Sequence, residues 1–174
     1  PPGTGKTTLA RIAALLTESE FYEISAVNSG VADIRKVIES ARQAWKTCQR
    51  GTILFIDEIH RFNKAQQDAV LPYIENGTVR LIGSTTENPS FEVIPALLSR
   101  CQTFRLEPLG LGQIRDILER ALLDKENGLG VAELEVSPEA LDMIISHANG
   151  DARRALNVLE AAYNVVTQQD TRQV

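Results

Sequence analysis

The first eight residues, PPGTGKTT, limit what this chain can fold into more than any other stretch. A phosphate-binding loop follows the pattern G-x-x-x-x-G-K-[ST], and Gly5, Lys6 and Thr7 supply its last three required positions. The first glycine of the pattern would stand one residue before Pro1, so the sequence begins inside the motif. Residues 8–16 are predicted to form a helix, whose positive N-terminal end would point at the phosphates.

The residue types in this loop suit phosphate binding. Gly3 and Gly5 have no Cβ, so their backbone N–H groups can approach phosphate oxygens closely. The Lys6 ammonium suits the β- and γ-phosphates, and the Thr7 hydroxyl is a ligand that Mg²⁺ accepts. A glycine-rich turn with an exposed lysine is the alternative. The candidate nucleotide-binding residues are Gly3, Thr4, Gly5, Lys6, Thr7 and Thr8.

Composition narrows the class of protein. The 174 residues are enough for one domain, or one domain with a small satellite, and 43% of them are hydrophobic. The formal charge of −5 does not support nucleic-acid binding through overall positive charge, so any such contact must use a local basic patch. The apolar runs are all shorter than the roughly 20 residues that span a bilayer. Cys48 and Cys101 lack zinc-ligand spacing, and we expect two free, buried thiols in a reducing compartment.

Strand and helix patterns alternate over the first two thirds of the chain. The run TILFI at residues 52–56 is continuously apolar, which is typical of a parallel strand buried on both faces. The other predicted strands are residues 21–27, 79–82 and 103–106, and the other predicted helices are residues 31–49, 64–75 and 96–99. This alternation indicates an α/β fold with a doubly wound parallel sheet.

After residue 110 the pattern changes to helices only, at about 113–126, 138–148 and 151–168. We therefore expect two domains, an α/β domain over residues 1–109 and a small helical domain over residues 110–174.

Two acids, Asp57 and Glu58, follow the apolar strand directly. In open α/β sheets ligands bind beyond the carboxyl ends of the strands, where both this pair and the phosphate loop would lie. Asp57 is placed to hold Mg²⁺ through its water shell, and Glu58 to orient or deprotonate an attacking water. The alternative is that the two acids simply begin the next turn. A small-molecule kinase does not need a glutamate that activates water, so Glu58 argues against that class of enzyme.

Thr85 and Thr86 follow the next predicted strand and should lie at the same edge. A hydroxyl there could hold the attacking water or the γ-phosphate, although a local Ser/Thr turn is the alternative. The sequence does not choose between the two threonines.

Three arginines are candidates for phosphate contacts. Arg100 follows a short apolar turn and, in an oligomeric ATPase, could reach the γ-phosphate bound by a neighbour. Asp151 is a good N-cap, which puts Arg153 and Arg154 in the first turn of a helix. Each cation at this positive end of the helix lowers the stability of the helix by about 0.3 to 1 kcal/mol. A bound anion such as an ATP phosphate would offset that loss. A nearby acidic partner such as Glu160 or Glu139 would offset it as well.

Taken together, these stretches resemble the AAA+ ATPases of the clamp-loader clade, and within it the RarA/MgsA group, the bacterial relatives of the Werner-helicase-interacting ATPase. The strings that carry the resemblance include PPGTGKTTLA, TILFIDEIHRFNKAQQDAVLP, GSTTENPSFEV, ALLSRC and NGDARRALN. They cover nearly the whole chain. The strings TTENPSFEV and HRFNKAQQDA are narrow signals, whereas many NTPases share the phosphate loop.

The resemblance implies a role for each candidate residue. Lys6 and Thr7 would belong to the Walker A motif, and Asp57 and Glu58 to Walker B, with ATP as the nucleotide and Mg²⁺ as the metal. The remaining assignments are Thr85 as sensor 1, Arg100 as the arginine finger and Arg153 as sensor 2. The fold implied is a P-loop NTPase sheet of five parallel strands, followed by a helical AAA+ lid that begins near residue 110.

The resemblance also implies a function and partners. Members form homo-oligomers, commonly tetramers in bacteria, and remodel DNA or DNA-bound proteins at stalled replication forks and gaps. The partners implied are DNA with single-strand/duplex junctions and single-strand-binding protein, without a membrane. The location implied is the bacterial cytoplasm, with the nucleoid, or the nucleus in a eukaryote. Alternatives are a clamp-loader subunit, a branch-migration motor, or a nucleotide-bound scaffold subunit that does not hydrolyse ATP.

The chain departs from the family pattern in several places. The first motif glycine and the strand that feeds it are absent, as is the C-terminal oligomerisation region, so we expect the 174 residues alone to be a weak ATPase. Ser84 stands where relatives usually have alanine, and we assign it no catalytic part. Gly110 replaces the usual Ser/Thr cap of the first lid helix. Four basic residues near helix starts are candidate DNA contacts, with a plain solvated surface as the alternative: Arg35, Lys36, Arg61 and Lys64.

Overall fold

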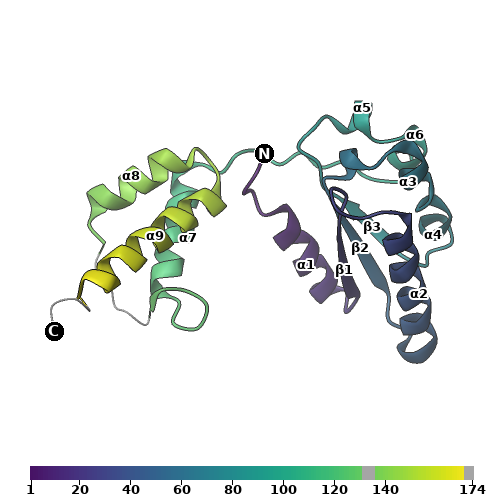
Figure 1. The fold of residues 1–174 in the computed structure, drawn as a ribbon, viewed down its shortest axis with the longest axis horizontal. Helices are drawn as coiled ribbons and strands as arrows, with labels where there is room; N and C mark the ends of the chain where they lie inside the picture. The colour runs from purple at the N-terminus through teal and green to yellow at the C-terminus, as the bar shows by residue number, and fades with distance from the viewer. Residues whose placement is uncertain (131–135, 171–174) are drawn as a thin grey trace. The chain divides into compact units, whose positions relative to one another are not determined.

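A computed structural model describes residues 1–130 and 136–170 of the chain, with side chains up to residue 167 (Figure 1). The chain forms two compact units. One is Lys6–Arg105, and the other combines Pro1–Gly5 with Leu106–Val174. We call the first the sheet unit and the second the helical unit.

A parallel sheet of three strands, in the order β1-β2-β3, forms the centre of the sheet unit. The strands are β1 (Glu20–Ser25), β2 (Thr52–Asp57) and β3 (Arg80–Gly83). Five of the six residues of β2 are buried, as the continuous apolar run predicts for a strand covered on both faces. Helix α1 (Lys6–Leu16) lies over one face of the sheet and α2 (Val31–Cys48) over the other (Figure 1).

The main core lies on the α2 side of the sheet. Alternate residues of β2, Leu54 and Ile56, pack there with Ile34 and Ile38 of α2. On the other face Phe21 stacks on Phe55, with ring centroids 6.0 Å apart. The period of two along β2 thus supplies both layers.

Helix α1 buries a different face from the one that the sequence suggests. Ala10 and Ala14 are its buried residues, whereas Leu9 and Leu16 are exposed. The small alanine side chains allow the helix to lie close to the sheet. The large apolar side chains of α1, Leu9, Ile12 and Leu16, are therefore not on its buried face.

Two other predictions were wrong. A single helix was predicted over residues 64–75, but the structure has α3 (Lys64–Asp68) and α4 (Leu71–Glu75). Pro72 sits in the first turn of α4, where its missing N–H costs nothing, and within a longer helix its ring would clash with the preceding turn. Residues 103–106 form no strand in the described part of the chain, because no ladder of the three-stranded sheet extends to them.

The remaining short helices of the sheet unit are η1 (Ile59–Arg61), α5 (Pro89–Glu92) and α6 (Pro95–Leu98). The helical unit holds α7 (Leu111–Leu123), α8 (Pro138–Ala148) and α9 (Ala152–Asp170). Its core is formed by residues of all three helices, namely Ile114, Leu118, Leu141, Ile144, Ile145, Ala148, Ala155 and Leu159. Gln113 Oε1 accepts a hydrogen bond from Gly110 N at 2.8 Å, so α7 has a cap from its own first turn.

Both cysteines are free, as predicted, but both are exposed rather than buried. Cys48 is the last residue of α2, and Cys101 follows α6. Among the helices that the structure describes, none is long and apolar enough to cross a membrane.

Candidate functional site

The carboxyl ends of β2 and β3 bring the predicted acids and hydroxyls together. The parallel register pairs Ile56 with Gly83, so the residues that follow each strand leave the sheet from adjacent points. The pairing continues past the strands, since Ile59 N donates to Ser84 O at 2.9 Å. Residues 57–60 therefore lie beside residues 84–86, which is the edge where ligands bind in open α/β sheets.

Asp57 is the last residue of β2, and its Oδ1 accepts a short hydrogen bond from Ser84 Oγ. Ser84 is only 5% exposed, and its Oγ also accepts a weak bond from Glu58 N at 3.4 Å. No catalytic role is predicted for Ser84 from the sequence, but its hydroxyl lies against the Asp57 carboxylate and is therefore part of the candidate site. A carboxylate beside hydroxyl groups fits a hard cation such as Mg²⁺.

Glu58 begins the turn out of the sheet with φ 55° and ψ 47°, in the left-handed region. A residue other than glycine is uncommon there, and such strain is concentrated at functional sites. Its carboxylate Oε2 accepts a hydrogen bond from Thr86 Oγ1 at 3.2 Å and lies 3.3 Å from His60 Nε2. The turn thus presents the carboxylate to residues that follow β3.

His60 lies between Thr85 and the Glu58 carboxylate. Its Nδ1 lies 2.9 Å from Thr85 Oγ1, and its side chain is only 8% exposed. Glu87 N also donates to Thr85 Oγ1, at 3.0 Å. The described residues contain no cluster of three or more metal-ligating side chains. The contact of His60 with Glu58 was missed because it depends on how β2 and β3 pair.

Lys6 and Thr7 form the first turn of α1. The end of α1 leads through a short turn into the start of β1, and Glu20 N donates to Gly51 O at 2.8 Å at that edge of the sheet. The helix therefore runs back along the strands, and its first turn is directed toward the carboxyl ends. This places the candidate lysine and threonine at the same edge as the acids.

Residues 1–5 belong to the helical unit. Gly3 and Gly5 have φ of 63° and 84°, values that suit glycine, and Thr4 Oγ1 donates to Pro1 O at 3.1 Å. Gly3 O accepts a hydrogen bond from Ala152 N at 3.2 Å. A Cβ on Gly3 would overlap Asp151 Oδ1, so this close approach requires glycine.

Arg153 lies in the first turn of α9, as predicted. Arg154 N donates to Asp151 Oδ1 at 3.1 Å, so the aspartate caps the helix. Gly150 before it has φ +81°, and a Cβ there would meet Pro108 Cβ at 2.8 Å. The Arg153 side chain is exposed. The turn is thus tightly built, and the arginine it carries is accessible.

Arg100 follows α6 and is held by its own chain. Its Nη2 lies 2.6 Å from Glu75 Oε1, and its Nη1 donates to Ala96 O at 2.8 Å. The side chain is nevertheless 40% exposed. The guanidinium is therefore fixed at the surface of the sheet unit with part of it open to solvent.

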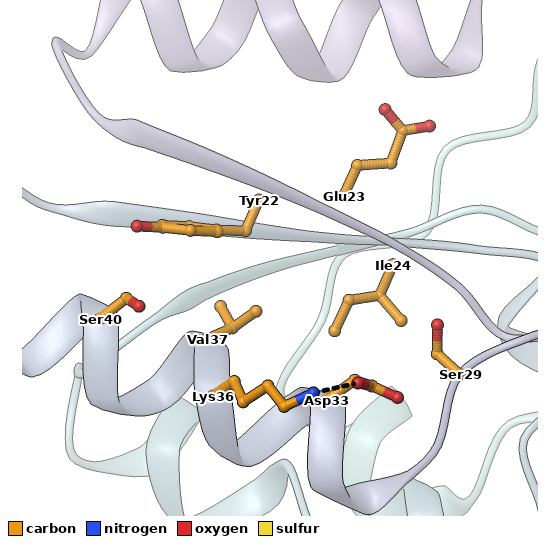
Figure 2. A pocket seen from close by; sticks show the side chains of 8 residues that line it. All are labelled: Tyr22, Glu23, Ile24, Ser29, Asp33, Lys36, Val37 and Ser40. Atoms are coloured by element: carbon orange, nitrogen blue, oxygen red, sulfur yellow. Dashed lines mark hydrogen bonds and ion pairs between the residues drawn. The ribbon is translucent and has the colours of Figure 1, made fainter.

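A shallow hollow of about 340 Å³ lies between β1 and α2 (Figure 2). Its apolar part is formed by Tyr22, Ile24 and Val37. Of its three charged residues, Lys36 and Asp33 bind each other at 3.1 Å, and the third is the acid Glu23. The described residues that line the hollow therefore offer no unpaired positive charge to a phosphate. We therefore take the edge beyond β2 and β3 as the candidate site.

Comparison with known families decides the class of protein. The model of the ATPase family associated with various cellular activities (AAA) matches residues 1–109. The chain belongs to the AAA ATPase family. The phosphate loop, the acids after β2 and the threonines after β3 all fall within the matched part of this AAA chain, and the family implies nucleotide binding.

Individual relatives show which group within the AAA family this chain is similar to. It is 50% identical to replication-associated recombination protein A of Escherichia coli K12 over 171 residues, which are 98% of the chain and 38% of that protein. It is 47% identical to the ATPase WRNIP1 of Dictyostelium discoideum, with 98% of the chain and 19% of that protein covered. The chain therefore spans well under half the length of these relatives.

Among solved structures, the Thermotoga maritima RuvB Holliday junction branch migration motor superposes with a TM-score of 0.77 and is 28% identical. The match covers 98% of the AAA chain and 54% of that structure. The recognition of the RarA group and of a P-loop AAA+ fold, made from the sequence, is confirmed by these comparisons.

Proposed function

We propose that this chain is the nucleotide-hydrolysing part of an oligomeric Mg²⁺-dependent ATPase that acts in replication-associated recombination and repair. The observation that carries the proposal is the grouping of Asp57, Glu58 and the threonine hydroxyls at one edge of a parallel sheet, toward which the first turn of α1 is directed. The names of the relatives support the cellular process.

Each candidate residue then has a physical task. The loop amides of residues 3–8 and the Lys6 ammonium bind the triphosphate of ATP. Thr7 and Asp57 would hold Mg²⁺, which neutralises phosphate charge when it is bound. Glu58 takes a proton from the attacking water, and a hydroxyl of Thr85 or Thr86 helps to orient it. Arg100 of a neighbouring subunit and Arg153 of the lid meet the charge that develops on the γ-phosphate.

The proposal includes the domain division and the partners. Residues 1–109 form the nucleotide-binding domain and residues 110–174 the lid, of which residues 131–135 and 171–174 lie outside the described part of the chain. The full-length protein forms a homo-oligomer, by resemblance a tetramer. It acts on DNA with single-strand/duplex junctions and meets single-strand-binding protein there.

Two alternatives are less well supported. A branch-migration motor agrees with the likeness to RuvB, but that likeness is 28% identity against 50% for the recombination protein. A scaffold subunit that never hydrolyses ATP would not need a lysine, a glutamate and an arginine at the three catalytic positions. Lys6, Glu58 and Arg100 are all present.

Replacing Glu58 by Gln in the full-length protein tests the proposal. The variant should bind ATP with unchanged affinity but lose turnover, because the amide cannot accept the proton of the attacking water. Glu126→Gln, a change of the same kind at an exposed residue of the helical unit, is the control and should be as active as the wild type. Turnover retained by the Glu58→Gln enzyme would refute the assignment.

The DNA part of the proposal is tested by comparing ATP turnover on single strands, duplexes, gapped DNA and forked DNA. We expect the strongest stimulation by gapped and forked DNA. Neutralising the four basic candidates at once should lower salt-dependent DNA binding, because each lost phosphate contact removes a released counterion. Those residues are Arg35, Lys36, Arg61 and Lys64. Equal DNA binding by the neutralised variant would leave them as plain surface charges.

A further inference from the structure

We propose that His60 is a positioning residue that joins the Thr85 hydroxyl to the Glu58 carboxylate and fixes the direction of the proposed general base. The inference rests on the proposed function, because it gives His60 a task in the chemistry of Glu58. It assigns the two threonines different tasks: Thr86 acts on Glu58 directly, and Thr85 acts on it through the imidazole.

The geometry provides a continuous chain of contacts. His60 Nδ1 lies 2.9 Å from Thr85 Oγ1, and His60 Nε2 lies 3.3 Å from Glu58 Oε2. The imidazole is only 8% exposed, whereas the Glu58 side chain is 28% exposed. A buried ring with a partner at each nitrogen is held in one orientation, so it can hold a more exposed carboxylate in turn.

Donor and acceptor counting assigns the tautomer. Glu87 N donates to Thr85 Oγ1 at 3.0 Å, so the oxygen already accepts a bond and its own proton is available for donation. Donation from Thr85 to Nδ1 leaves the proton of a neutral imidazole on Nε2, where it faces the carboxylate of Glu58. The reverse tautomer would set an Nε2 lone pair against a carboxylate oxygen. This tautomer sets a donor rather than a lone pair beside the Glu58 carboxylate, and it leaves only the long 3.5 Å contact of Thr85 Oγ1 with Glu87 O without a proton.

Both contacts of the Glu58 carboxylate fall on the same oxygen. Thr86 Oγ1 donates to Oε2 at 3.2 Å, and His60 Nε2 approaches that oxygen too. Within the described residues Oε1 has no hydrogen-bond partner, so it is the oxygen that is open to a water. The Thr86 hydrogen bond and the close approach of the His60 Nε2 both act on Oε2, and in this proposal they set the direction in which Oε1 points.

The link joins residues that follow two different strands. Thr85 follows β3 and His60 follows β2, so a shift of the loop after β3 moves the partner of Nδ1. The imidazole would pass that shift to Glu58. Loss of His60 should therefore lower kcat while the KM for ATP stays nearly unchanged.

Two substitutions of similar size separate the two ends of the ring. His60→Asn places an amide near the position of Nδ1, so it can still meet Thr85 but cannot reach Glu58. His60→Gln places an amide NH₂ near the position of Nε2, so it can still donate to Glu58. Both are made in the full-length protein, beside Glu58→Gln and the matched control His147→Asn, which changes the exposed histidine of α8.

We expect His60→Asn to lower kcat by about 10- to 100-fold, as is typical when a group that orients a reacting residue is removed, and His60→Gln to restore most of it. Thr85→Val should cost much less in the His60→Asn background than in the wild type, because both changes break the same link. Nucleotide affinity and the melting temperature are measured for every variant.

Three results would overturn the inference. The first is ATP turnover by His60→Asn within about twofold of the wild-type rate while Glu58→Gln is inactive. A twofold change in rate is no larger than the effect of an ordinary surface substitution. The second is equal loss in His60→Gln and His60→Asn together with a lower melting temperature, which would mark a packing role. The third is full additivity with Thr85→Val. Turnover by Glu58→Gln would instead refute the proposed function itself.

Discussion

At the scale of single residues, Thr52 is a polar group whose burial is not compensated. It opens β2, is 2% exposed, and its Oγ1 has no hydrogen-bond partner among the residues that the structure describes. A buried hydroxyl without a partner costs about 1 to 3 kcal/mol in mutational data. Valine has nearly the same shape without the hydroxyl.

We therefore expect Thr52→Val to raise the free energy of unfolding by about 1 kcal/mol, measured by urea unfolding. Thr47→Val is the control, because the Thr47 hydroxyl is exposed and bonds only to Gln43 O in its own helix. That variant should lie within about 0.5 kcal/mol of the wild type. A loss of stability in Thr52→Val would mean that the hydroxyl has a partner, such as a bound water.

Residue types at the candidate site could be predicted from sequence, but their contacts could not. Asp57, Glu58 and Thr85 were selected because acids and hydroxyls follow two apolar strands, a pattern that needs no knowledge of register. Ser84 and His60 were missed because each meets a partner more than 20 positions away. Such contacts follow from the pairing of Ile56 with Gly83, which no local pattern reveals.

At the scale of elements, Gln67 links α3 through hydrogen bonds to the segment that leads into α6. It is 2% exposed, and its amide makes three hydrogen bonds. Nε2 donates to Phe62 O and to Glu92 O, each at 3.0 Å, and Oε1 accepts from Ile94 N at 2.9 Å. One side chain thus satisfies backbone groups both before α3 and at the junction of α5 and α6.

We expect Gln67→Leu to lower the free energy of unfolding by about 2 to 4 kcal/mol, because it leaves two buried backbone groups and one partly buried group without partners. Urea unfolding measures the change. Gln43→Leu on the exposed face of α2 is the matched control and should change stability by less than about 0.5 kcal/mol. If the two substitutions cost the same, the three bonds of Gln67 contribute nothing to stability.

Element types followed from the sequence better than their ends and packing did. The β2 run and the three helices of the helical unit were predicted because apolar periodicity is strong there. The division between α3 and α4 was missed because the helical period continues across Pro72, although a proline there favours a new helix start. Residues 103–106 have strand character, but a strand forms only where a ladder is available.

At the scale of the whole molecule, the proposed oligomer builds each nucleotide site from residues of two neighbouring subunits. In the proposal, Lys6, Asp57 and Glu58 act at one nucleotide site, whereas Arg100 serves the site of a neighbour. The structure agrees with a surface role for Arg100, since Glu75 Oε1 holds it at 2.6 Å and it stays 40% exposed. A guanidinium fixed by a carboxylate of its own chain is pre-organised for a partner that approaches from outside.

Mixing two inactive full-length variants distinguishes a neighbour's arginine from one that acts within its own chain. Glu58→Gln lacks the base but keeps Arg100, and Arg100→Ala lacks the arginine but keeps the base. Each alone should be inactive, since a trans arginine contributes on the order of 10³ to 10⁵ in rate. In a mixed oligomer, the Arg100→Ala subunit receives the arginine of its Glu58→Gln neighbour, so about a quarter of the sites in a random equal mixture become complete.

Steady-state ATP turnover of the mixture measures the number of complete sites. The dilution reference is Glu58→Gln mixed with the exposed control variant Glu126→Gln. No gain over the separate variants would show that Arg100 does not act across subunits.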